Sequence, residues 1–181
     1  MIPEKQKQFI ESYEGTHKGR YFIMYLTIIG IAGGEELMKK ARKEFGRPQY
    51  LPDQMYPTKE AAKIVMYAVE NGVSALRIGK MVAQTFMRSR PEMLEGMTAE
   101  TVLDIISRAY SSETDYSDEV VILEQGAGRG RVKRKDNPMP CEFFQGLIEG
   151  FFAYLDVPVQ VKESKCQWRD DTDGCIYEVK W

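Results

Sequence analysis

The chain has 181 residues, of which 43% are apolar and 29% charged, and its formal net charge is −2. This length suits one domain, and the apolar share is large enough to bury a core and excludes a disordered chain. A charge so close to zero gives no overall field that would attract nucleic acid or an anionic membrane. We therefore expect a single globular domain over residues 1–181 with no nucleic-acid partner.

Three features bear on the compartment. The first seven residues are mostly polar, unlike a signal peptide. The longest apolar run, residues 21–34, is shorter than the roughly 20 residues of a membrane-spanning helix, so a buried helix and no membrane span are expected. The three cysteines are an odd number at wide spacing, unlike a secreted disulfide scaffold. The sequence thus favours a cytoplasmic location.

The first part of the chain, about residues 1–112, has a helical pattern. Apolar residues recur at steps of three and four over residues 21–29, which predicts a helix. The glycines of residues 30–34 should separate this helix from a second one at 35–45, because glycine destabilises a helix interior. A proline-containing loop follows over 46–57. Further helices are predicted at 58–70 with Thr58 as N-cap, at 74–88, and at 98–109 with Thr98 as N-cap.

The period of the pattern changes in the second part, about residues 113–181. A strand at 119–125 and a partner at 131–135 flank a glycine-rich turn, and a helix follows at 138–154. Residues 157–161 and 175–181 alternate as the arms of a last hairpin. The predicted fold class is therefore α+β: an N-terminal helical part followed by a ββαββ antiparallel sheet with helices packed on it.

The three cysteines are the candidate metal site. If the last hairpin closes about Asp170 and Asp171, Cys166 and Cys175 lie opposite each other, with Cβ atoms about 4.5–5.5 Å apart. Cys141 enters the helix that should pack on this sheet. Three thiolates suit zinc or another soft metal, with water or a fourth residue completing the shell. The alternative is that the three are small buried apolar residues.

No catalytic residues are identified. The only histidine, His17, precedes the first apolar helix and is expected at the surface, and no nucleophile motif accompanies it. The glycines of residues 126–131 lack the third glycine and the following helix of a dinucleotide-binding loop. The basic residues of 129–135 have no interleaved aromatic residues for base stacking. We therefore expect a binding domain rather than a self-sufficient enzyme.

The last forty residues resemble a known family. The pattern consists of Cys141-Glu-Phe-Phe-Gln-Gly146-Leu-Ile-Glu-Gly150, then Cys166, then Asp-Gly174-Cys175, and it resembles the 4-vinyl-reductase domain. That family belongs to a superfamily that also includes haem nitric-oxide sensors and subunits of the TRAPP tethering complex. The resemblance implies a helical part followed by ββαββ, a small-molecule-binding role, and a metal held by Cys141, Cys166 and Cys175.

The same resemblance argues against haem. The haem nitric-oxide branch needs an axial histidine in the central helical region and a Tyr-x-Ser-x-Arg group. Residues 74–112 contain no histidine, and Arg108-Ala-Tyr110-Ser-Ser112 does not match that order. Haem is therefore not expected as the cofactor.

Three functional hypotheses remain open. The first is a small-molecule-binding sensor or regulatory domain for a hydrophobic ligand, because a methionine-rich core can adapt to a bulky apolar guest. The second is an accessory protein in tetrapyrrole vinyl reduction, which would need a partner for hydride because the sequence has no nicotinamide or flavin motif. The third is a TRAPP-like scaffold that works as a dimer through its apolar helices, and a homodimer is expected.

Overall fold

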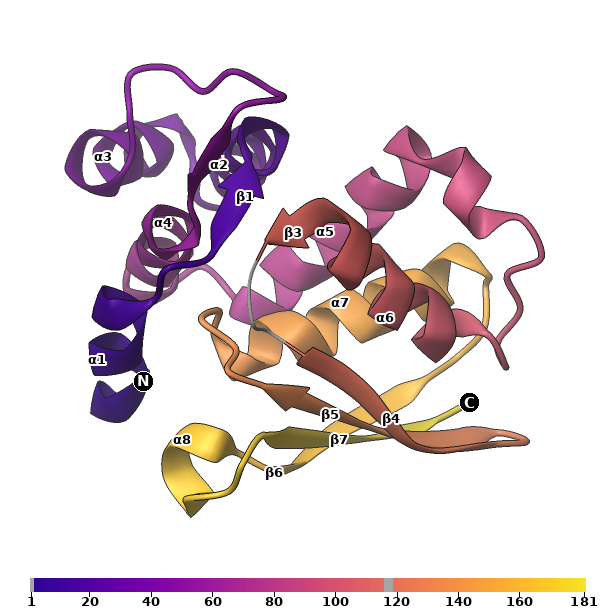
Figure 1. The fold of residues 1–181 in the computed structure, drawn as a ribbon. Coiled ribbons are helices and arrows are strands. Elements are labelled where there is room, and N and C mark those ends of the chain that lie inside the picture. The colour runs from indigo at the N-terminus through magenta and orange to yellow at the C-terminus, as the bar shows by residue number, and fades with distance from the viewer. Residues whose placement is uncertain (1, 116–118) are drawn as a thin grey trace.

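The computed structural model describes residues 2–115 and 119–181, and for residues 93 and 109–115 it describes the backbone only. Figure 1 shows a helical N-terminal part beside a sheet that carries the C-terminal part. The N-terminal elements are α1 (Glu4–Ser12), β1 (Thr16–Lys18), α2 (Gly19–Gly33), α3 (Glu35–Phe45), β2 (Met55–Pro57), α4 (Thr58–Glu70), α5 (Ala75–Ser89), a short 3-10 helix (Pro91–Leu94), α6 (Val102–Glu113) and β3 (Thr114–Asp115). The C-terminal elements are β4 (Glu119–Gly126), β5 (Arg129–Lys135), α7 (Cys141–Tyr154), β6 (Gln160–Lys165), α8 (Gln167–Asp170) and β7 (Cys175–Lys180).

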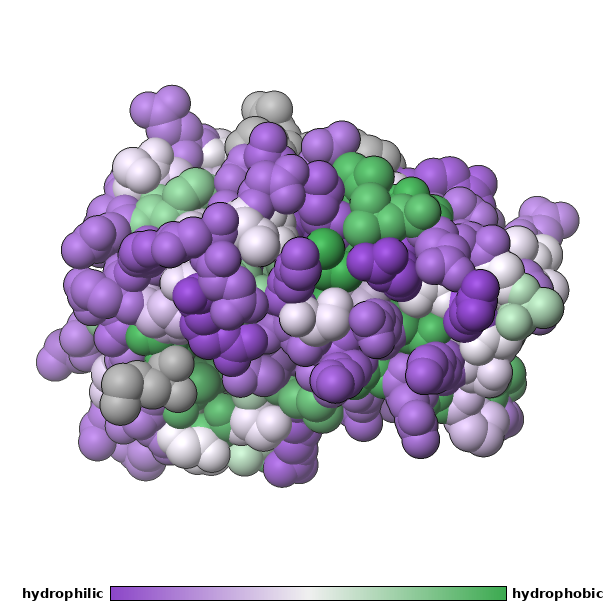
Figure 2. Space-filling model, turned by 90° about the horizontal axis from the view of Figure 1, so that it is seen from below, coloured by the Kyte–Doolittle hydropathy of each residue, from purple (hydrophilic) through white to green (hydrophobic). Residues whose placement is uncertain are grey.

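The C-terminal strands form one antiparallel sheet in the order β4-β5-β7-β6. Helices α6 and α7 lie on one face of it (Figure 1). Alternate strand residues such as Val132, Tyr177 and Val179 are buried on that face. The opposite face, seen from below the sheet, is dominated by hydrophilic residues (Figure 2). One buried and one solvated face is the usual state of an antiparallel sheet, and the predicted α+β class with ββαββ order is confirmed.

Helices α5 and α7 pack unusually close together. A Cβ atom added at Gly146 of α7 would lie 2.0 Å from the Leu76 carbonyl oxygen, and one at Gly79 of α5 would lie 2.0 Å from the Phe143 oxygen. Glycine is therefore required at both positions, because only its missing side chain lets the two backbones meet. This contact sets the start of α7 beside the start of α5, where the cavity described below is found.

A second sheet was not predicted. It has three short strands in the order β2-β1-β3, with His17 of β1 opposite Tyr56 of β2. Strands of two or three residues are too short to show alternation, so no hydrophobic pattern in the sequence indicates them.

His17 and the two threonine caps need correction. His17 is buried, 4% exposed, rather than at the surface, and its Nδ1 lies 3.1 Å from the Thr58 hydroxyl oxygen. Thr58 is the first residue of α4 and not its N-cap, because its hydroxyl is used by the histidine.

Thr98 does not cap a helix either: its N–H donates to the Thr101 hydroxyl, and α6 begins at Val102. Ser74, in contrast, caps α5 by accepting from the Arg77 N–H at 3.3 Å.

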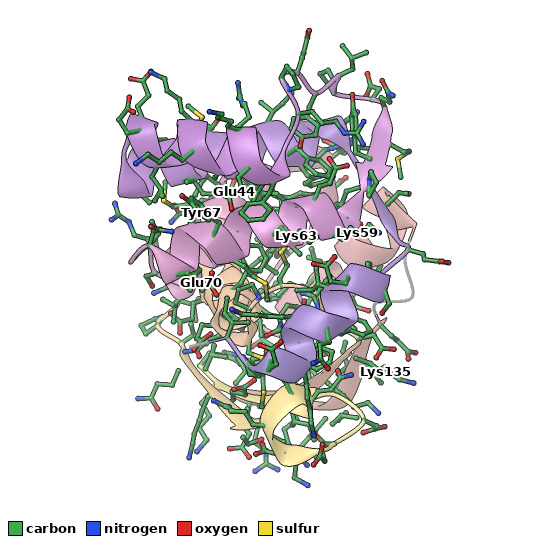
Figure 3. The ribbon with its side chains drawn as sticks, turned by 90° about the vertical axis from the view of Figure 1, so that its left-hand side faces the viewer. Glu44, Lys59, Lys63, Tyr67, Glu70 and Lys135 are labelled. Carbon is green, nitrogen blue, oxygen red and sulfur yellow. The ribbon has the colours of Figure 1, made fainter. Side chains whose placement is uncertain are left out.

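Helix α1 joins the helical part to the cysteine-bearing corner. It lies along α4, whose residues Lys63 and Glu70 point toward it in Figure 3. Lys63 pairs with Glu11 at 2.7 Å, and Lys7 pairs with Glu70. On the other side of α1, the Gln6 amide donates to the Met139 carbonyl oxygen at 2.6 Å, two residues before α7. Helix α1 is thus bonded both to α4 and to the segment that leads into α7.

None of the helices in the described ranges is both long enough and apolar enough to cross a membrane.

Candidate metal centre and adjoining cavity

The three cysteines lie at the corner where α7, β6 and β7 begin or end. Cys141 is the first residue of α7, Cys166 follows β6, and Cys175 is the first residue of β7. The register pairs Lys165 with Ile176, so Cys166 and Cys175 face each other one residue further along. This is the arrangement that the sequence predicted. The short helix α8, which lies between them, was not predicted.

The sulfur atoms meet. Cys141 Sγ lies 3.6 Å from Cys166 Sγ and 3.6 Å from Cys175 Sγ, and all three thiols are free and buried. In a tetrahedral site with metal–sulfur bonds of about 2.3 Å, the sulfurs would be about 3.8 Å apart. The observed separations therefore fit three thiolates around one ion.

Neighbouring groups hold the cysteines in place. The Tyr177 hydroxyl donates to the Cys141 carbonyl oxygen at 3.1 Å, and the Gln167 N–H donates to Cys175 Sγ at 3.3 Å. The Cys166 N–H donates to Asp170 Oδ2 at 2.7 Å. Each cysteine is thus positioned by a hydrogen bond to its own backbone or sulfur, as preorganised ligands are.

Glu163 supplies a fourth donor. One carboxylate oxygen of Glu163 and the three sulfurs all lie within 4.8 Å of one another. Its Oε2 accepts from the Arg169 guanidinium, whereas its Oε1 is buried without a hydrogen-bond partner among the described residues. A buried carboxylate oxygen without a partner is destabilising, and a cation at the cluster would satisfy it.

Sequence reasoning missed Glu163. Its position three residues before Cys166 was a usable signal, since both lie near the end of one strand. A glutamate in an alternating strand is ordinarily assigned to the solvated face, and here it is only partly exposed on the face that carries buried Val161.

The three thiols differ in acidity. The contact between the Cys141 and Cys175 sulfurs lowers the pKa of Cys175 and raises that of Cys141. Burial raises the pKa of Cys166. Cys175 is therefore the most acidic of the three thiols, and a metal ion at the cluster would deprotonate all three.

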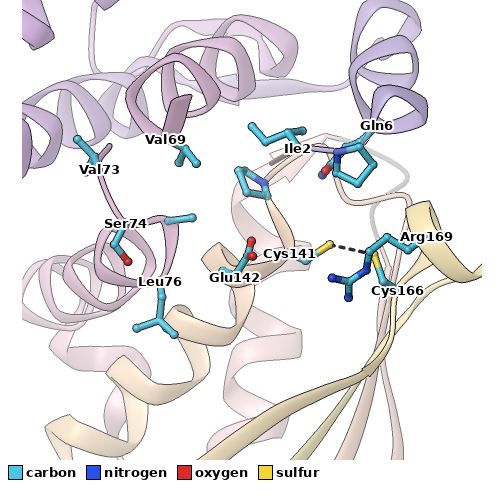
Figure 4. Close-up of a pocket in the computed structure, with 13 residues that line it drawn as sticks. Ile2, Gln6, Val69, Val73, Ser74, Leu76, Cys141, Glu142, Cys166 and Arg169 are labelled. Atoms are coloured by element: carbon cyan, nitrogen blue, oxygen red, sulfur yellow. Dashed lines mark hydrogen bonds between the residues drawn. The ribbon is translucent and has the colours of Figure 1, made fainter. Parts of the chain in front are cut away.

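A cavity of about 260 Å³ adjoins the cluster (Figure 4). Cys141 and Cys166 belong to its wall, and Cys175 is not among the described residues that line it. The rest of the wall mixes apolar and polar side chains from α1, the α4–α5 turn, α5, α7 and α8: Ile2, Pro3, Gln6, Val69, Val73, Ser74, Ala75, Leu76, Pro140, Glu142 and Arg169. The cluster and the cavity thus share two residues.

Comparison with known proteins places the fold. No protein-family model matches the chain, and no curated protein matches it in sequence. Solved H-NOX (haem nitric oxide/oxygen-binding) proteins match it in structure. The S. oneidensis H-NOX protein in the Fe(II)NO state is 12% identical with a TM-score of 0.72, and the match covers 90% of this chain and 98% of that one. A K. algicida H-NOX variant in the unliganded Fe(II) state is 15% identical with a TM-score of 0.71, covering 90% and 95%. The chain has the H-NOX fold.

Two expectations are corrected by these neighbours. The assignment of residues 141–181 to the 4-vinyl-reductase family is wrong, because no family model matches and the structural neighbours are H-NOX domains. The cysteine pattern and the order of elements resemble those of that family, whereas the order is also that of the H-NOX fold. The cofactor expectation, zinc or another soft metal with haem not expected, is also contradicted, because the structural neighbours are haem-binding H-NOX proteins. A further neighbour carries the description "Modulating Heme Redox Potential Through Protein-Induced Porphyrin Distortion". It is 15% identical with a TM-score of 0.65, and the match covers 91% of this chain and 99% of that one.

The cavity beside the cysteines does not fit a haem. Its volume of about 260 Å³ is below the roughly 300–1,000 Å³ of pockets for drug-sized ligands. His17, the only histidine, lies outside its wall and is bonded to Thr58. The cavity does contain thiols, which can ligate haem iron, but both belong to the cluster with Glu163. No step through haem is derived from this cavity.

Proposed function

We propose that the chain is a small-molecule-binding sensor or regulatory domain that carries a metal ion on Cys141, Cys166, Cys175 and Glu163. Three sulfurs and one carboxylate oxygen within 4.8 Å support the metal. Four protein ligands leave no open position, as in structural rather than catalytic metal sites. The ion would stabilise the corner where the sheet meets α7, and it would not act on a substrate itself.

The cavity is the proposed ligand site. The observation that carries this proposal is that Cys141 and Cys166 belong both to the cluster and to the cavity wall. A ligand that contacts these side chains would change the geometry of the ion, and the ion fixes the wall that the ligand meets. Such coupling between two sites is what a sensor requires. The H-NOX fold supports the proposal, since its solved members include a protein with NO bound to iron.

Metal binding is tested by elemental analysis of the purified protein and by titration with Co²⁺. We expect one ion per chain, and with Co²⁺ a sulfur-to-metal charge-transfer band. Cys175→Ser should lose both signals. Glu178→Gln, which changes a carboxylate of the same strand outside the cluster, should keep them. Folded native protein that contains no metal and gives no Co²⁺ band would refute this part of the proposal.

Ligand binding is tested with indole as a small aromatic probe. We expect indole to raise the melting temperature of the native protein, by about 2–4 °C for each kcal/mol of binding energy gained. Val69→Trp, which would fill the cavity, should abolish the shift. Val157→Trp, a partly buried valine outside the cavity wall, should retain it. Equal shifts in the two variants would show that indole binds elsewhere.

A further inference from the structure

We propose that the cavity selects a primary ammonium ion joined to a small apolar body, and that Glu142 is the residue that selects it. The inference rests on the proposed function, because it concerns the ligand of the same cavity. It adds the charge and the functional group of that ligand.

Glu142 places a carboxylate on the cavity wall. It is the second residue of α7, and its side chain projects from the helix into the cavity (Figure 4). Among the described residues, this side chain has no hydrogen-bond or ion-pair partner, and it lies outside the metal cluster. A carboxylate offers two oxygens that accept hydrogen bonds, and it donates none. Glu142 is therefore available to a ligand that brings both a positive charge and N–H donors.

The other charges of the wall do not cancel that of Glu142. Arg169 is the one cation among the described lining residues, and its guanidinium donates to Glu163 Oε2. With a divalent ion bound, the three thiolates and the Glu163 carboxylate leave two negative charges in excess at the cluster, and Arg169 offsets one of them. The cavity therefore carries a negative potential, which attracts a cation and repels an anion.

The rest of the wall suits an apolar body of limited size. The volume of about 260 Å³ is below the roughly 300–1,000 Å³ of pockets for drug-sized ligands, so one ring with a short chain is the largest guest expected. Aliphatic side chains of the described wall can cover such a body: Ile2, Val69, Val73, Ala75 and Leu76. A hydrated metal ion would leave this apolar surface in contact with water, so an organic cation fits better.

The wall also distinguishes two kinds of organic cation. Quaternary ammonium groups are bound by cages of aromatic rings, and none of the described lining residues is aromatic. A primary ammonium group has three N–H donors, and its hydrogen bond to a carboxylate is charge-assisted and therefore strong. Glu142 thus favours a primary amine in its protonated form.

Three probes of similar size and different charge test the inference in the protein as purified, after its metal content has been measured. The probes are 2-phenylethylamine, 2-phenylethanol and phenylacetate, which at neutral pH are a cation, a neutral molecule and an anion. In calorimetric titrations at low salt, the amine should bind about tenfold more tightly than the alcohol, as one charge-assisted hydrogen bond would give, and the anion should bind most weakly. Added salt should reduce the advantage of the amine.

Glu142→Gln is the decisive variant, because it keeps the shape of the side chain and removes its charge. It should lower the affinity for the amine to that for the alcohol, and it should leave the affinity for the alcohol and the metal content unchanged. Glu178→Gln, which lies outside the described cavity wall and the cluster, should retain the preference for the amine. The N-trimethylated amine should bind to the native protein more weakly than the primary amine does.

A role of Glu142 in helix stability alone gives a different result. A negative charge at the start of a helix is stabilised by the helix dipole. If this is all that Glu142 does, Glu142→Gln should lower the melting temperature without changing the order of the three affinities, and the inference would be overturned. Equal affinities of the amine and the alcohol for the native protein, or tighter binding of phenylacetate, would overturn it too.

The proposed function has its own readouts. Binding of indole without a preference for the amine would overturn the inference alone. If neither indole nor the amine bound, the ligand site of the proposed function would be refuted and the inference with it. A preference for the amine that depends on Glu142 in metal-free protein would support the inference and refute only the proposed metal ion.

Discussion

Glu163 illustrates at the residue scale how one side chain changes the interpretation of a site. Three cysteines alone are compatible with small buried apolar residues. A carboxylate with one oxygen held by Arg169 and the other buried beside the sulfurs is not explained by core packing. The four donors together therefore favour a metal site over three inert thiols.

Glu163→Gln should weaken metal binding by at least about tenfold, because even groups outside the coordination shell change metal affinity by about 10–100-fold. A competition titration with a chromophoric chelator measures this. Glu178→Gln serves as the control. Glu178 lies on β7 opposite Lys162 of β6, and it does not belong to the cluster. Equal affinities in the two variants would remove Glu163 from the site.

His17 should make stability depend on pH. Burial, with a smaller contribution from the charge of Arg134, lowers the pKa of His17 to about 3. The unfolded chain protonates this histidine near its ordinary pKa of about 6.5, so below that pH the unfolded state binds the extra proton. The contribution of the neutral histidine to the free energy of unfolding is present above about pH 6.5. It is lost as the pH falls toward 3, by up to about 1.4 kcal/mol per pH unit.

Urea unfolding of the native protein and His17→Gln between about pH 7 and pH 5 tests this. The variant should lose less stability over that range, because glutamine can still bond to Thr58 but does not titrate. Carboxylates contribute equally to both proteins, so the difference belongs to His17. Parallel pH profiles would contradict the prediction.

At the scale of elements, the contact between α5 and α7 builds the cavity. Gly79, Gly146 and Gly150 let the two backbones approach, and the same contact brings Ala75 and Leu76 beside Cys141. The wall that a ligand would meet is therefore set by helix packing rather than by a loop. Sites built on packed elements are held more rigidly than sites on loops.

Gly146→Ala should destabilise the protein by about 1–3 kcal/mol or more, because its Cβ would lie 2.0 Å from the Leu76 carbonyl oxygen and force α5 and α7 apart. Gly30→Ala in α2 is the matched control. Its Cβ would make ordinary contacts at 3.7 Å, and a helix gains roughly 0.5–1 kcal/mol from this change. Chemical denaturation should show opposite signs for the two variants, and equal effects would disprove the packing argument.

At the scale of the molecule, the cysteine corner connects parts that are far apart in sequence. The cluster joins the start of α7 to the terminal strands, while Gln6 ties α1 to the residues just before α7. Trp168 of α8 packs on Phe9 of α1 with ring centroids 4.9 Å apart. An ion at the cluster would therefore stabilise the contact between the first and last elements of the chain.

Removing the ion should lower the melting temperature of the whole domain. A ligand present at 100 times its Kd stabilises the native state by about 2.7 kcal/mol, and about 2–4 °C is expected for each kcal/mol in a chain of this size. We expect a chelator to lower the melting temperature by roughly 5–10 °C, reversibly. Cys175→Ser should be insensitive to the chelator. A native protein whose melting temperature the chelator leaves unchanged would argue against a structural ion.

The sequence by itself determined the class and order of elements and the three thiols. The sequence pattern located α2, α3, α5 and α7 and three strands of the main sheet, β4, β5 and β7, because each is long enough to show a hydrophobic repeat or a clear propensity. The strand expected at residues 157–161 overlaps β6 (Gln160–Lys165) only at its first two residues. The register of the last hairpin followed from its turn residues, which brought Cys166 opposite Cys175. A resemblance of short motifs did not identify the family, since one order of elements is common to several.

Only the tertiary structure decided what surrounds those thiols. The burial of His17, the fourth donor at Glu163 and the cavity wall shared with Cys141 all depend on contacts between residues distant in sequence. Local propensity contains no information about which side chains meet across elements, because burial and packing set those meetings. The short strands and α8 could not be predicted from the sequence, because two to four residues are too few to show a period.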